Sequence, residues 1–166
     1  GVPLPPLLEG GHQESGRRAG TEPVPLIAGM ATALESFAAD QLTCMKHVQT
    51  MRDQLQHDLQ QHCEPTVVHG INASRLPNTL SIAFPGLSGE AILVNLDLEG
   101  VACSLGSTCA SGSAEPAPAL LAMGCASDVC LSSVRFSVSR QNTSEEIAEA
   151  ALRIRNVVKK LRSLSS

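Results

Sequence analysis

The chain has 166 residues, a formal net charge of −4, and three phenylalanines as its only aromatic side chains. This length suffices for one domain, or for one domain with an arm, and the core must be built from aliphatic residues. The acidic balance and the scarcity of rings argue against nucleic acid and anionic membranes as partners. No apolar run approaches the roughly 20 residues of a membrane span. No secretory signal accompanies the six cysteines, so we expect reduced thiols and a cytoplasmic location.

Residues 1–24 are rich in proline and glycine and are predicted to be mainly loop. Their apolar start, which lacks an initiator methionine, predicts a segment of a larger protein. A helical pattern begins at Leu26 and runs, with a break near Asp40, to about His62, before the stop at Glu64 and Pro65. Apolar residues in its second half recur at three- and four-residue steps and predict one buried stripe of Leu42, Met45, Val48, Met51, Leu55 and Leu59.

Short strand and helix patterns alternate after this helix, which predicts an α+β fold. We expect a small antiparallel or mixed sheet, flanked by helices, over residues 41–166, with residues 1–40 as a separate N-terminal arm. The expected strands cover 66–69, 80–84, 101–104 and 134–138. The expected helices cover 90–98, 117–123 and the stretch from 143 onward, the first capped by Ser88 and the last by a capping box of Thr143 and Glu146.

Glycine, serine, alanine and threonine surround Cys109 in the segment 106–113. These residues cannot pack an apolar core around a thiol, so Cys109 is predicted to be an accessible nucleophile. Bare composition also fits a plain linker, but ordered-looking flanks hold both ends of the segment, and such loops often carry function. Cys103 is expected in the core. A zinc site of Cys103, Cys109, Cys125 and Cys130 disagrees with the usual ligand spacing.

Arg135 stands between Val134 and Phe136 in a strand pattern, so its side chain would lie on the face opposite theirs. It is either an edge charge or a bidentate grip on a carboxylate. Together with Cys109 it would form a site for an amino acid. Segment 10–21 has two arginines, several glycines and the hydroxyl of Thr21, and could bind a phosphate through backbone N–H groups. The histidines at 47, 57, 62 and 69 are expected on the surface.

Four segments together resemble cysteine desulfurases of the NifS type, in the class V aminotransferase family. Residues 10–21 are similar to that family's G-G-x-Q-E…R-x-G-T motif and residues 75–79 to its R-L-P-N segment. Residues 104–116 are similar to the loop S-S-G-S-A-C-x-S-G-x-x-E-P, and residues 132–137 to the strand S-S-[IV]-R-[FL]-S. The motifs occur in the family's order across nearly the whole chain. Leu105 and Thr108 depart from the loop motif, as does 117–120 from the stretch that follows it.

The resemblance implies the C-terminal domain of a fold-type I pyridoxal phosphate enzyme over 41–166, with the end of the large cofactor domain over 1–40. Cys109 would take the sulfur of L-cysteine as a persulfide, leaving L-alanine, and Arg135 would bind the substrate carboxylate. Thr21 would contact the phosphate of the pyridoxal 5′-phosphate held by the other subunit of a homodimer. A scaffold protein for iron–sulfur clusters, or a tRNA-thiolation route, would accept the sulfur, and Cys109 could serve as a transient iron–sulfur ligand.

The family's cofactor lysine, which follows a Ser-x-His segment, has no counterpart in this sequence, nor do the aspartate and histidine that hold the pyridoxal ring. The lysines present are Lys46, Lys159 and Lys160, all in helical patterns. The resemblance therefore implies the C-terminal part of the enzyme, inactive by itself. A selenocysteine lyase, and a non-enzymatic sulfur carrier or dimerising module, remain open alternatives.

Overall fold

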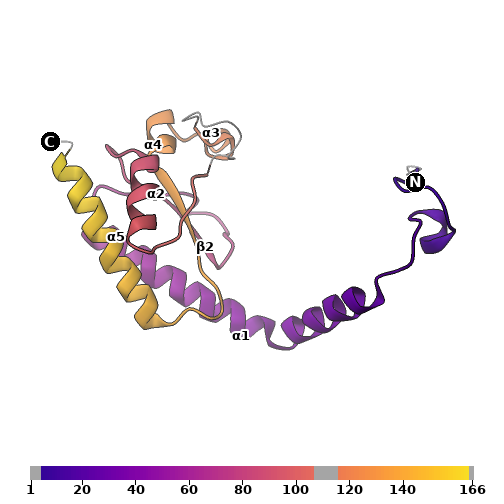
Figure 1. The fold of residues 1–166 in the computed structure, drawn as a ribbon. Coiled ribbons are helices and arrows are strands. Elements are labelled where there is room, and N and C mark those ends of the chain that lie inside the picture. The colour runs from indigo at the N-terminus through magenta and orange to yellow at the C-terminus, as the bar shows by residue number, and fades with distance from the viewer. Residues whose placement is uncertain (1–4, 107–115, 165–166) are drawn as a thin grey trace. The chain divides into compact units, whose positions relative to one another are not determined.

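The computed structural model describes residues 5–106 and 116–164 (Figure 1). Its residues divide into two compact units, Gly1–Gln41 and Leu42–Ser166. The elements in chain order are the 3₁₀-helix η1 (Gln13–Gly16), α1 (Val24–His62), β1 (Val67–Val68), β2 (Thr79–Ala83), α2 (Gly89–Leu98), α3 (Pro118–Ala122), α4 (Ser127–Leu131), β3 (Ser133–Ser137) and α5 (Ser144–Leu164). Helices around a small sheet confirm the predicted α+β class.

The long helix α1 is interrupted at Asp40, whose φ of −123° and ψ of 16° leave the helical region. The predicted break is therefore confirmed, and it lies beside the division between the two units. In the first unit, the helical residues before this break have exposed apolar side chains, among them Leu26, Ile27, Met30, Leu34 and Phe37.

The sheet of the second unit is antiparallel, with strand order β1-β2-β3. Directly opposite residues share a face of an antiparallel pair, so the register sorts the side chains into two sets. The pairs Leu80–Phe136 and Ile82–Val134 are buried and form the core face. The pair Ser81–Arg135 lies on the other face. This second set, with Thr79, Ser133 and Ser137, makes a polar sheet face.

Three helices supply the apolar partners of the core face. The shared cluster contains Leu55 and Leu59 of α1, Ile92 and Leu96 of α2, and Ile154 and Val158 of α5, all at most 3% exposed. The predicted caps are present: Ser88 Oγ accepts from the backbone N–H of Ala91 at 3.4 Å. The Thr143 hydroxyl and the Glu146 carboxylate each accept a hydrogen bond from the other's backbone N–H, at 3.3 and 3.1 Å.

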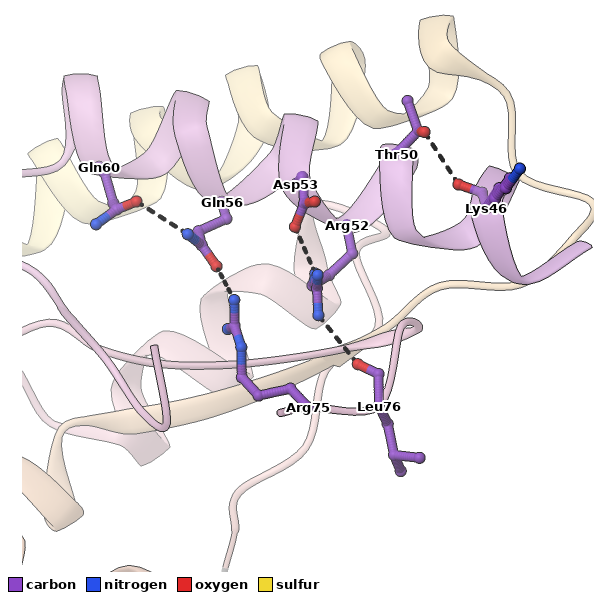
Figure 2. A network of polar contacts seen from close by, with 8 residues as sticks. All are labelled: Lys46, Thr50, Arg52, Asp53, Gln56, Gln60, Arg75 and Leu76. Atoms are coloured by element: carbon purple, nitrogen blue, oxygen red, sulfur yellow. Dashed lines mark hydrogen bonds and ion pairs between the residues drawn. The ribbon is translucent and has the colours of Figure 1, made fainter. Parts of the chain in front are cut away.

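Polar side chains fasten the segment before β2 to α1 (Figure 2). The buried Arg52 donates through Nη1 to the carbonyl of Leu76 at 3.0 Å and through Nε to Asp53 at 2.7 Å. Arg75 donates from Nη2 to the side-chain oxygen of Gln56 at 3.0 Å. Because β2 pairs with β3, these bonds also link the sheet to α1.

Three sequence expectations need correction. Residues 101–104 form no strand in the described chain, and only Ser104 pairs, through one isolated bridge to Arg135. Leu42 and Met45 are exposed, because the core elements bury α1 only from Val48 onward. The short helix α4 was not expected at all. Among the described residues, no helix combines the length and the hydropathy that crossing a bilayer requires.

Candidate functional site

Arg135 occupies the middle of β3 with its side chain exposed on the polar sheet face, between the buried Val134 and Phe136. Its backbone pairs with Ser81 of β2 on one side. On the other side its N–H donates to the carbonyl of Ser104 at 2.7 Å, and its carbonyl accepts from the N–H of Ser104 at 3.0 Å. Within the described residues no hydrogen bond or ion pair engages the guanidinium. The backbone is therefore fixed on both edges while five N–H donors face outward.

Ser104 leads directly into the segment that contains Cys109, and both ends of that segment are held. Leu105 packs against the core, where a Cβ at Gly89 would stand 3.2 Å from its side chain and 2.8 Å from the carbonyl of Leu131. Gly106 lies before the segment and Ala117 beyond its far end, and a Cβ at Gly106 would stand 3.3 Å from Cβ of Ala117. The two ends are thus side by side, at the edge of the polar sheet face. Cys109 itself lies outside the described residues.

The glycine-rich segment 10–21 forms a tight turn in the first unit. The side-chain oxygen of Gln13 accepts from the backbone N–H of Gly20 at 3.2 Å, and a Cβ at Gly11 would approach that oxygen to 2.3 Å, so a larger residue there would displace the Gln13 side chain. Arg18 donates from Nη1 to the carbonyls of Gly20 and Thr21, each at 3.3 Å. Thr21 is exposed. Its hydroxyl and the neighbouring N–H groups are donors of the kind that bind phosphate.

Residues 4–149 match the family described as aminotransferase class-V. The chain belongs to this family. It is 44% identical over 160 residues to a cysteine desulfurase of Enterobacter agglomerans, across 96% of this chain and 40% of that protein. A solved structure titled NifS-like protein matches with a TM-score of 0.82 at 31% identity, over 97% of this chain and 40% of its own. Another, titled SspA in complex with cysteine, matches with a TM-score of 0.55 at 26% identity, over 84% and 37%.

These matches confirm the resemblance to cysteine desulfurases of the NifS type that the four motifs carried. The class-V chain spans about 40% of the length of the curated relatives it matches. Its three motif positions with predicted roles fall in different places: Thr21 in the first unit, Arg135 in the second, and Cys109 in the segment outside the described residues.

The described cysteines form no disulfide. Burial raises the pKa of Cys63 to about 11, and burial together with Asp97 raises that of Cys103 to about 11. The Cys103 thiol packs at the margin of the core, which agrees with its expected position. Both thiols are held in the protonated, weakly nucleophilic form at neutral pH. Neither competes chemically with an exposed thiol such as the one predicted at position 109.

One histidine, His69, is buried and not on the surface as the sequence predicted. It is only 6% exposed. It lies just after β1, where its backbone N–H bonds to the carbonyl of Ser81 at 3.0 Å, and its ring contacts Ser133 and Cys125. A single histidine beside a two-residue strand has no periodic signal, so sequence reasoning had no means of finding this contact.

The lysines of the class-V chain are all exposed and lie on α1 and α5. The first unit, which holds the glycine-rich turn and Thr21, has no lysine in its sequence. The residues present therefore fit the phosphate of pyridoxal phosphate but offer no buried amine for its aldehyde. In the described ranges, no three His, Cys, Asp or Glu side chains gather in a group that could hold a metal.

Proposed function

We propose that this chain forms part of a pyridoxal-phosphate-dependent cysteine desulfurase, in which Cys109 takes the sulfur of L-cysteine and L-alanine is released. The observation that carries the proposal is the position of Arg135. Its exposed guanidinium stands on a polar sheet face, and its backbone is bonded to Ser104 at the entrance to the segment with Cys109. The relatives named cysteine desulfurase, and the cysteine held by SspA, support the same substrate.

Arg135 would bind the amino acid through its carboxylate. The planar guanidinium can donate two parallel hydrogen bonds to the two carboxylate oxygens, which fixes both the position and the orientation of the substrate. The hydroxyl of Ser81 stands beside it on the same face. Because this face is polar and open, the arginine needs no rearrangement of the core to receive its ligand.

Cys109 would act as the nucleophile. It follows Ser104, the backbone partner of Arg135, by five residues, a stretch of chain that spans at most about 18 Å. The thiolate forms a bond to the substrate sulfur as the carbon–sulfur bond of the substrate breaks, which leaves a persulfide on Cys109. Pyridoxal phosphate, when bound, supplies the electron sink that this cleavage requires.

The Thr21 hydroxyl and the neighbouring backbone N–H groups would bind the phosphate of the pyridoxal phosphate held by the other subunit of a homodimer. The three lysines are exposed on helices, and none belongs to the first unit with Thr21, so we propose that none of them carries the cofactor. From the same family membership we also propose a homodimer, a sulfur-accepting scaffold protein as partner, and a cytoplasmic location.

The direct test locates the transferred sulfur in the full-length protein. After incubation with pyridoxal phosphate and L-cysteine, peptide mass spectrometry should find one extra sulfur on Cys109, with alanine formed in step. Cys109→Ser should abolish sulfide release and leave cofactor absorption unchanged, while Cys103→Ser should retain activity. Extra sulfur on Cys103, Cys125 or Cys130, with none on Cys109, would refute the assignment.

A further inference from the structure

A second thiol is held against a histidine at the edge of the sheet. The Nδ1 atom of His69 lies 3.5 Å from Sγ of Cys125, and its Nε2 atom lies 2.8 Å from Oγ of Ser133. His69 follows β1, whereas Cys125 lies in the turn between α3 and α4, 56 residues further on, and Ser133 lies at the start of β3, 64 residues further on. This group is defined here as the Cys125–His69–Ser133 cluster.

The hydrogen bonds of the cluster determine where its protons are. Ser133 Oγ also lies 2.7 Å from the carbonyl oxygen of Val129, which can only accept, so the serine hydroxyl donates there. Ser133 must therefore accept from His69, which places a proton on Nε2. A neutral imidazole protonated at Nε2 presents a lone pair at Nδ1. That lone pair faces the thiol of Cys125, which is the donor.

Burial keeps the ring in this neutral form, because it lowers the pKa of His69. The cluster thus has the three parts of an activated nucleophile: a thiol, a base within hydrogen-bond reach of it, and a third group that fixes the orientation of the base. Cys125 is intermediate in exposure, whereas Cys63 and Cys130 are buried.

The other thiols differ from Cys125 in one or both respects. Cys63 and Cys103 have pKa values raised to about 11 and no histidine beside them in the described chain. Cys130 is only 5% exposed, and its thiol lies 3.7 Å from the carbonyl of Cys125. Cys44 of α1 is also intermediate in exposure, and no hydrogen bond joins its thiol to a histidine in the described chain. Among the cysteines that the structure describes, only Cys125 combines partial exposure with a hydrogen-bonded base.

We propose that Cys125 is a second reactive thiol, which undergoes exchange with small-molecule disulfides and uses His69 as its general base. The thiol proton moves to Nδ1 as Sγ attacks one sulfur of the disulfide. A new sulfur–sulfur bond forms to Cys125 while the reagent's own bond breaks, and the departing thiolate takes the proton from His69. Cys125 ends as a mixed disulfide, and half of the reagent is reduced to a thiol.

The test measures the reaction rate of each cysteine with 2-hydroxyethyl disulfide, a small uncharged reagent. The folded full-length protein is reacted, quenched with acid and digested, and the peptides are analysed by mass spectrometry. Cys125 should react at least tenfold faster than Cys63 and Cys103. His69→Gln should slow Cys125 at least tenfold, and His57→Gln, which changes an exposed histidine of α1, should leave it within twofold. Equal rates at Cys125 and Cys103, or an unchanged rate in His69→Gln, would overturn the proposal.

Ser133 variants keep the test decisive if His69→Gln loosens the fold, which would show as faster reaction of the buried Cys63. Ser133→Ala removes the group that fixes the ring and should slow Cys125 about threefold or more, with Cys63 still protected. Ser133→Thr retains a hydroxyl and should restore the rate. A rate at Cys125 that is unchanged in both Ser133→Ala and His69→Gln would show that His69 does not act as its base and would overturn the proposal. Labelling of Cys109 is mapped separately, so this outcome is independent of the desulfurase activity.

Discussion

Replacing Arg135 with alanine separates a carboxylate grip from an ordinary surface charge. The side chain is exposed and engages no described group, while the backbone bonds to Ser81 and Ser104 do not depend on it. The free energy of unfolding should therefore change by no more than about 0.5 kcal/mol. A hydrogen bond to a charged group contributes about 1.5–3 kcal/mol. At about 1.4 kcal/mol per factor of ten, kcat/KM for L-cysteine should fall by about 10- to 150-fold.

The assay is the rate of alanine formation against cysteine concentration in the full-length protein with pyridoxal phosphate, alongside urea unfolding of each variant. Arg140→Ala provides the matched control, because Arg140 is an exposed arginine in the turn after the same strand. The kcat/KM of Arg135→Lys should fall between those of the wild type and the alanine variant, since an ammonium keeps the charge but cannot donate two parallel hydrogen bonds to a carboxylate. An Arg135→Ala variant that keeps kcat/KM within twofold, or an Arg140→Ala variant that loses as much, would refute the reasoning.

Three further outcomes are expected. Ile154→Ala, at a fully buried site of α5, should lower the free energy of unfolding in urea by about 2–5 kcal/mol, and Leu152→Ala, whose side chain is 41% exposed, by less than about 1 kcal/mol; similar losses would place the core elsewhere. Thr143→Ala should cost about 1 kcal/mol in the same assay through loss of the capping hydroxyl, and no change would mean that the cap is not formed in solution. Borohydride reduction of the 166-residue chain with pyridoxal phosphate should leave no stoichiometric pyridoxyl group on any lysine, and one such adduct accompanied by sulfide release would show a complete enzyme. The three lysines to be mapped are Lys46, Lys159 and Lys160.

Patterns among residues close together in the sequence predicted the local structure well. The capping box at Thr143, the cap at Ser88 and the helix break at Asp40 all depend on residues within a few positions of one another. The same holds for β3, where alternation puts Val134 in the core and Arg135 on the polar face. Local geometry decides such features, so a single sequence contains enough information to find them.

Features that depend on residues distant in the sequence were missed or misplaced. The burial of His69 is set by Ser133 and Cys125, 64 and 56 residues further on. The exposure of Leu42 depends on where the sheet and α5 stop contacting α1, which no periodicity reveals. Residues 101–104 have strand-like composition, but only Ser104 has a partner.

The candidate site divides in the same way. The sequence placed Arg135 on a sheet face apart from its neighbours, and the structure confirms that position. The pairing of Arg135 with Ser104 could not be predicted, because a bridge of one residue between segments 31 positions apart leaves no pattern. The roles proposed for Cys109 and Thr21 follow from motif resemblance, and locating the transferred sulfur tests that of Cys109.

The backbone bridge between Ser104 and Arg135 separates the position of Arg135 from the length of the segment 107–115. Because Arg135, the proposed carboxylate-binding residue, is held by β2 and by Ser104 before the segment 107–115, changes in the length of that segment need not disturb it. Insertions or deletions there would alter how far a thiol can be presented to an acceptor. They would leave the recognition of the amino acid unchanged. Under the proposed function, proteins of this kind with segments of different length would pass sulfur to different acceptor proteins while they take it from the same amino acid.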